Sequence, residues 1–219
     1  MRAAGLVKHR ATCPCPTHRH KEEVSLEYLI AVLRVIHIVN AILMAWPFYV
    51  LVIANHRARL GPPLGDRADI YMESIIQNRA IPCFIFQSTA LVSGLALILL
   101  RGMGLGALIS NPALGLKFLL LLLITAQLTY VHTRLHPQLD ALFAQAGLPV
   151  PEDIATRITA LRVRRKRLAS ICLFCVLTVA MLGVQVWQPF PVWLTVVLVL
   201  AIALFTWRSY RRAPAFGWV

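Results

Sequence analysis

The sequence predicts an all-α, polytopic membrane protein, a four-helix bundle with a fifth transmembrane helix. Its residues are 58% hydrophobic and only 14% charged, with a mean hydropathy of +0.70, whereas soluble domains carry about 25% charged residues. Five apolar runs also approach the ~20 residues that cross a bilayer as a helix. None shows the two-residue alternation of a membrane β-barrel. The runs are residues 25–53, 81–100, 113–131, 168–186 and 192–207.

A basic polar segment, residues 1–24, precedes the first run. Its prolines predict a disordered tail, because they interrupt regular structure. The tail also carries two thiols and two imidazoles, which are the side chains that bind copper or zinc. They belong to Cys13, Cys15, His18 and His20. Because a tetrahedral metal site needs a folded frame, we favour a disordered tail over a metal site.

The first run, residues 25–53, carries polar residues where a spanning helix should be apolar. Arg34, His37 and Asn40 are spaced three apart, so they lie along one stripe of a helix and should face other helices. Ionisable side chains inside a membrane cost about 2.5–3.5 kcal/mol each, which makes them candidates for a functional site. Pro47 should kink this helix, because proline removes a backbone hydrogen bond.

The third run, residues 113–131, has Lys117 near its start. A polar stripe of threonine and histidine follows at four-residue steps, and it ends at His132 and His136. Pro137 should end this span, because proline cannot continue a helix without losing a hydrogen bond.

The other spans carry fewer polar residues. Residues 81–100 have a small or polar edge that suits close contact between helices. Residues 151–167 combine an apolar strip with a dense Arg/Lys face, which predicts an amphipathic helix on the inner leaflet before the fourth span. We interpret Cys172 and Cys175 as packing residues of the fourth span rather than as a redox pair.

Charge predicts the orientation of a single transmembrane domain, residues 25–210, with a short C-terminal tail at residues 211–219. Seven Lys and Arg residues lie on the side of the N-terminus and fourteen on the other side. By the positive-inside rule the N-terminus is outside and the C-terminus is cytoplasmic. The excess of Arg over Lys favours a bacterial inner (plasma) membrane. The net charge of +13 flanks the apolar runs, so it should meet lipid headgroups rather than nucleic acid.

Imidazoles at membrane depth are the strongest candidates for binding a cofactor, because a bis-histidine pair between helices can hold b-type haem. His37 should lie ~14 Å and His132 ~28 Å into the membrane, since a helix rises 1.5 Å per residue. The two are therefore unsuited to ligate one haem, and an inner cluster of His56, His132 and His136 is a competing metal site. The sequence does not decide between a site that includes His37 and the inner cluster. No nucleophile elbow, zincin motif or P-loop is present, so no catalytic residue is assigned.

The types and order of several residues resemble those found in a superfamily of small membrane proteins. They are His37, Trp46, His56, the Met72-Glu73 pair, Pro82 and Lys117. The superfamily includes the HemJ-type protoporphyrinogen oxidase and the copper-resistance protein CopD. HemJ-type members bind haem b and depend on the first-helix His and the third-helix Lys, so the resemblance implies haem binding by His37 and Lys117 and an oxidoreductase activity. The third helix of those members has a central His where this chain has Gln127 or Leu128. The resemblance is therefore to an uncharacterised branch.

Taken with the resemblance, the residues predict that haem b is bound through His37 and a second ligand. The haem would serve electron transfer or the oxidation of a hydrophobic substrate, with Arg34 facing a propionate and a redox partner or membrane complex beside it. Two alternatives stay open. The protein would handle copper or another metal ion captured by its tail, or it would be a structural accessory subunit of a membrane complex.

Overall fold

The computed structural model describes residues 16–44, 46–78, 80–147 and 149–211, and within them every regular element is helical. Side chains are described from residue 24 onward. The elements in chain order are α1 (Pro16–Leu43), α2 (Trp46–Leu60), α3 (Arg67–Asn78), α4 (Ala80–Leu100), α5 (Ala107–Ser110), α6 (Pro112–Tyr130), a π-helical turn (Val131–Leu135), α7 (His136–Gln145), α8 (Glu152–Trp187) and α9 (Val192–Arg211).

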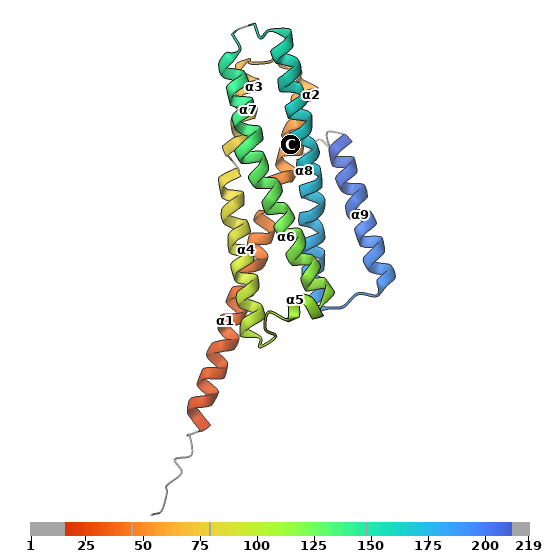
Figure 1. The fold of residues 1–219 in the computed structure, drawn as a ribbon. Helices are drawn as coiled ribbons and strands as arrows, with labels where there is room; N and C mark the ends of the chain where they lie inside the picture. Colours follow the sequence, from red (N-terminus) through yellow and green to blue (C-terminus); the bar gives the residue numbers. More distant parts are fainter. Residues whose placement is uncertain (1–15, 45, 79, 148, 212–219) are drawn as a thin grey trace, which may run out of the picture.

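Five helical segments of the described chain are long and apolar enough to cross a membrane, which confirms the five predicted spans. They are Val24–Leu60, Arg67–Leu100, Pro112–Gln145, Glu152–Trp187 and Val192–Arg211. In Figure 1 they run nearly side by side: α1 packs on α4, α6 packs on α8, and α9 lies along the outer side of α8. The closure of the first four into a four-helix bundle stays a prediction.

The first span is divided into two helices near Pro47, where the sequence predicts a kink. α1 ends at Leu43 and α2 begins at Trp46, so the break lies immediately before Pro47. Proline is well placed in the first turn of a helix, where its missing N–H costs no internal hydrogen bond. Pro47 is also fully buried, so the break is fixed by packing.

Two predicted boundaries are wrong. Pro137 does not end the third span, because a π-helical turn precedes it and the apolar segment continues through α7 to Gln145. A π turn changes the spacing of the backbone hydrogen bonds, so the helix continues although the backbone nitrogen of proline has no hydrogen to donate. Residues 151–167 do not form a separate helix on the leaflet either. Pro151 is the N-cap residue and residues 152–167 are the first part of the 36-residue α8. Their apolar strip packs on α7 through Ile158 and Leu139.

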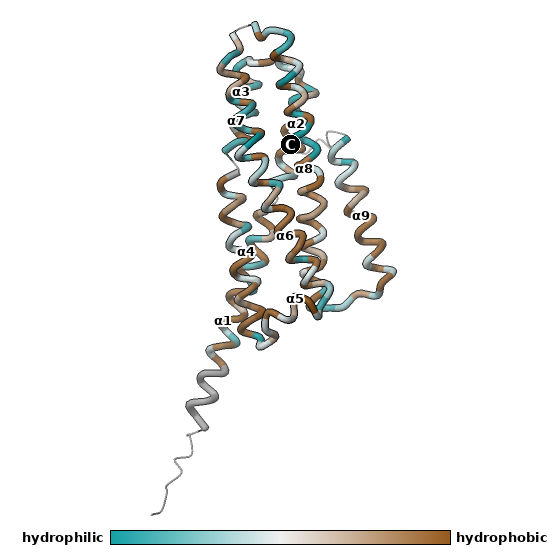
Figure 2. Tube along the Cα trace, in the orientation of Figure 1, coloured by the Kyte–Doolittle hydropathy of each residue, from teal (hydrophilic) through white to brown (hydrophobic). Residues whose placement is uncertain are grey.

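Two apolar clusters form the middle of the protein. One joins α4, α6 and α8 around Ile124, and the other joins α2, α3, α4 and α8 around Leu51 and Ile76. Figure 2 shows apolar residues along the middle of the helices and polar residues concentrated toward the end that holds α3, α7 and the start of α8. We call this the α3–α7 end. The opposite end, with α5 and the loop that joins α8 to α9, is the α5 end.

The two chain ends are described in part. α1 begins at Pro16 and projects beyond the other helices at the α5 end (Figure 1), so this part of the predicted tail is helical rather than disordered. Cys13 and Cys15 lie outside the described residues, and their proposed role in metal binding stays a prediction. α9 ends at Arg211, and the predicted C-terminal tail beyond it is likewise outside the described residues.

Candidate functional site

A cavity of about 610 Å³ lies between α1, α4, α6 and α8, with one side chain each of α2, α5 and α9 at its wall. Its walls are apolar apart from four cationic or imidazole side chains. These are Arg34, His37, Arg101 and Lys117. Three of the four, Arg34, His37 and Lys117, are among the candidates that the sequence identified, and the fold brings them to one space from α1 and α6.

His37 and Lys117 form a direct pair at the wall of this cavity. The Nε2 atom of His37 lies 3.1 Å from the Nζ atom of Lys117, and its Nδ1 atom lies 3.0 Å from the Oγ atom of Ser93. The start of α6 fixes the position of Lys117, because Asn111 caps the helix by accepting two backbone N–H groups and Pro112 follows it.

The hydrogen bonds assign the tautomer of His37. The hydroxyl of Ser93 donates to the carbonyl of Thr89 at 2.6 Å, and a hydroxyl has only one proton to give. The Nδ1–H tautomer of His37 fits this network, because its Nδ1–H donates to the oxygen of Ser93. The Nε2 atom then carries a lone pair, and Lys117 donates to it. The arrangement places one accepting imidazole nitrogen at the cavity wall, where Lys117 occupies it.

Two glycines allow this pair to form. A Cβ atom at Gly94 would lie 3.1 Å from the Cε1 atom of His37, and one at Gly183 would lie 3.3 Å from the Nζ atom of Lys117. Contacts below 3.4 Å are tighter than most side chains adopt, so α4 and α8 approach the pair closely because they lack side chains there. The sequence identified a small edge on α4 but gave no sign of the role of Gly183.

Two arginines lie at the α5 end of the cavity, around Trp187 at the end of α8. The guanidinium carbon of Arg34 is 3.9 Å from the centroid of the Trp187 ring, and that of Arg101 is 3.7 Å from it. The Nε atom of Arg34 is buried and has no hydrogen-bond partner. The sequence indicates Arg34 because it is a charged residue within an apolar run. Arg101 and Trp187 lie in a turn and at a helix end, where no periodic pattern marks them as site residues.

The other predicted histidines lie elsewhere. His132 is exposed and makes edge contacts with the rings of Phe84 and His136, whose centroids are 5.9 and 6.1 Å away. His56 is half-buried near the end of α2. None of these three histidines lines the cavity. Within the described part of the chain, no three His, Cys, Asp or Glu side chains lie close enough to bind a metal ion, so the predicted inner cluster of His56, His132 and His136 does not form.

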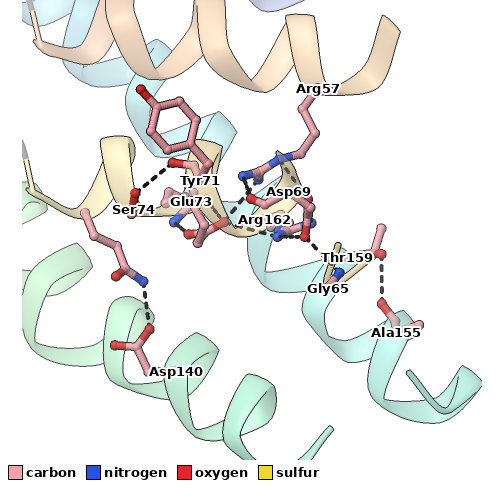
Figure 3. Close-up of polar contacts among 12 residues, drawn as sticks. Arg57, Gly65, Asp69, Tyr71, Glu73, Ser74, Asp140, Ala155, Thr159 and Arg162 are labelled. Carbon is pink, nitrogen blue, oxygen red and sulfur yellow. Dashed lines mark hydrogen bonds and ion pairs between the residues drawn. The ribbon is translucent and has the colours of Figure 1, made fainter. Parts of the chain in front are cut away.

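A second polar cluster occupies the α3–α7 end, where two carboxylates of α3 meet arginines of α2 and α8 (Figure 3). Arg162 donates to both oxygens of Asp69 at 3.1 and 2.9 Å, and Arg165 donates to both oxygens of Glu73. Arg57 donates to Glu73 at 3.1 Å. We call these five residues the ion-pair cluster. Each of the five has at least one partner within the cluster, so the cluster ties α2, α3 and α8 together.

The chain was also compared with protein-family models, with curated proteins and with solved structures, and none of the three comparisons found a match.

Proposed function

We propose that this chain is a multi-pass membrane protein that binds a hydrophobic ligand in its cavity, at the pair formed by His37 and Lys117. The observation that carries the proposal is this polar pair in the wall of an otherwise apolar cavity of about 610 Å³. Ligand pockets of roughly 300–1,000 Å³ are lined in the same way, with few polar groups on apolar walls. Ionisable groups at membrane depth are costly, and a ligand that contacts them would offset this cost.

Haem b is the first ligand to test. A metal-binding histidine usually anchors its other nitrogen by donating a hydrogen bond, and the Nδ1–H of His37 does so to Ser93. His37 would hold the iron through Nε2. Lys117 would first turn away, because metal–imidazole bonds are about 2 Å long and its Nζ atom lies 3.1 Å from this nitrogen. A bound haem would supply electron transfer or oxidation of a hydrophobic substrate.

The test is the visible absorption spectrum of the purified protein, expressed with an ample supply of haem. We expect a Soret band in the wild type and its loss in His37→Leu. His132→Leu is the matched control, because His132 is exposed and lies outside the cavity. A wild-type protein without a Soret band rules out haem b as the ligand, and a band that survives in His37→Leu rules out His37 as its axial ligand.

The alternative of metal-ion handling has less support, because the described residues contain no cluster of metal ligands. It depends on the segment that carries Cys13 and Cys15. Deleting residues 1–24 should then lower metal uptake, whereas it should leave a haem spectrum unchanged. If the protein is instead a structural accessory subunit, His37→Leu should change assembly with its partners but not the content of any cofactor.

The proposed setting is a bacterial inner membrane, with the N-terminus outside and the C-terminus in the cytoplasm. The α5 end would then face outward and the ion-pair cluster would face the cytoplasm. This orientation rests on the fourteen Lys and Arg residues of one side against seven on the other.

A further inference from the structure

The pair of arginines at the α5 end of the cavity has a charge that nothing in the described residues neutralises. Arg34 and Arg101 contact the ring of Trp187 at 3.9 and 3.7 Å. We call these three residues the arginine–tryptophan cluster. Cation–π contacts of this kind are weakly attractive at exposed sites, but an aromatic ring is not a counter-charge.

The arginines of the ion-pair cluster, at the other end of the protein, differ from these two because their charges are neutralised. Arg57, Arg162 and Arg165 each contact at least one carboxylate at the distance of an ion pair. Within the described part of the chain, neither Arg34 nor Arg101 has such a carboxylate. The two cations therefore repel each other, and a shared anion would relieve this repulsion.

A buried donor indicates where such an anion would lie. The Nε atom of Arg34 is shielded from solvent and has no hydrogen-bond partner, which costs the free energy of removing that N–H from water. The Nε atoms of Arg57 and Arg162 are in the same state, but those two guanidinium groups donate to carboxylates through their other nitrogens. Both arginines also line the cavity. An acidic group at the cavity mouth would accept from these guanidinium groups, whose planar donors match carboxylate and phosphate oxygens.

The cavity is long, and most of its lining is apolar. Its lining residues on α8 run from Leu173 to Trp187, which is ~21 Å along a helix that rises 1.5 Å per residue. The hydrocarbon core of a bilayer is ~30 Å thick, so this length along α8 is about two thirds of that thickness. Its walls are apolar along this length except at His37 and Lys117.

From the charge and the shape together, we propose that the cavity binds an acidic amphiphile. Its carboxylate or phosphate is held by Arg34 and Arg101, and its apolar body extends past His37 and Lys117. The inference rests on the proposed function, since it names the chemical class of the ligand for the same cavity. Trp187 is a positioning residue that holds the two guanidinium groups beside each other.

The experiment measures the dissociation constants of two pairs of probes for the detergent-solubilised full chain. One pair is palmitate and hexadecanol, and the other is haem and its dimethyl ester, so that within each pair only the acidic group is removed. We expect at least one acidic probe to bind about tenfold or more tightly than its neutral partner, because charge-assisted hydrogen bonds are worth about this much in affinity.

Arg34→Gln and Arg101→Gln should each remove most of this preference while leaving the affinity for the neutral probe within about twofold. Arg208→Gln is the matched control, since it removes the same charge from an exposed position of α9. Trp187→Leu keeps both charges and should weaken the preference less than either arginine substitution.

The outcomes separate the inference from the proposed function. If neutral and acidic probes bind equally to the wild type, or if both arginine variants keep the preference, the inference is wrong and the proposed cavity ligand stands. If no probe binds and no ligand co-purifies with the protein, both fail.

Discussion

Substituting Glu73 with Gln should destabilise the protein strongly, because it removes a charge that three arginines share. The carboxylate of Glu73 accepts from Arg165 and Arg57 and lies 3.2 Å from Arg162, with only 7% of its side chain exposed. Breaking a buried ion pair on one side costs about 3–5 kcal/mol. For a chain of this size, 1 kcal/mol corresponds to about 2–4 °C in Tm, so we expect a loss of roughly 6–20 °C.

The assay is thermal unfolding in detergent, followed with a dye that fluoresces when it reacts with thiols. Cys83, Cys172 and Cys175 are buried and free, so they should react only as the protein unfolds. Cys13 and Cys15 are replaced by serine so that these three thiols alone report. The control is Asp140→Asn, because Asp140 is exposed and accepts one hydrogen bond from Gln77; such surface groups contribute about 0–1 kcal/mol. A loss in Glu73→Gln no larger than that of the control would refute the structural role of the ion-pair cluster.

Three further predictions concern packing, the cavity and orientation. Leu135→Ala should cost about 2–5 kcal/mol in the same unfolding assay, because Leu135 is the last residue of the π-helical turn and is fully buried; a loss below about 1 kcal/mol would show that this turn is loosely packed. Ser93→Ala should weaken haem binding while leaving the affinity for hexadecanol unaffected, because it removes the acceptor that fixes the tautomer of His37; equal haem affinity would contradict the assigned tautomer. A fluorescent protein fused to the C-terminus should be fluorescent and protected from external protease in intact cells. Its digestion from outside would show that the orientation is the opposite of the proposed one.

The sequence predicts the number of spans well, because length and hydropathy determine which segments can cross a bilayer. Helix boundaries were less predictable. Pro137 looked like a terminator because the sequence does not show the π-helical turn that accommodates it. The basic face of residues 151–167 looked like a lipid-facing surface because the carboxylates that pair with Arg162 and Arg165 lie about 90 residues earlier in the chain.

The site was predicted only in part, because contacts between residues distant in the sequence cannot be read from it. Arg34, His37 and Lys117 are visible in the sequence, because charged and imidazole groups are conspicuous within apolar runs. Trp187, Arg101 and Gly183 become site residues only through contacts between distant segments. Spacing along one helix also suggested a histidine cluster, but His132 lies on an exposed face, where no third ligand comes from the described residues.

The most direct measurement of the central claim is the amount of hydrophobic small molecule that organic solvent releases per mole of purified protein, determined by mass spectrometry. Gly183→Leu should displace the ligand, because a side chain at this position enters the space beside Lys117. Gly147→Leu is the control, since a Cβ atom there meets no other atom. We predict close to one ligand per wild-type and Gly147→Leu chain and a several-fold lower amount in Gly183→Leu. Equal amounts in all three proteins would contradict a ligand bound at His37 and Lys117.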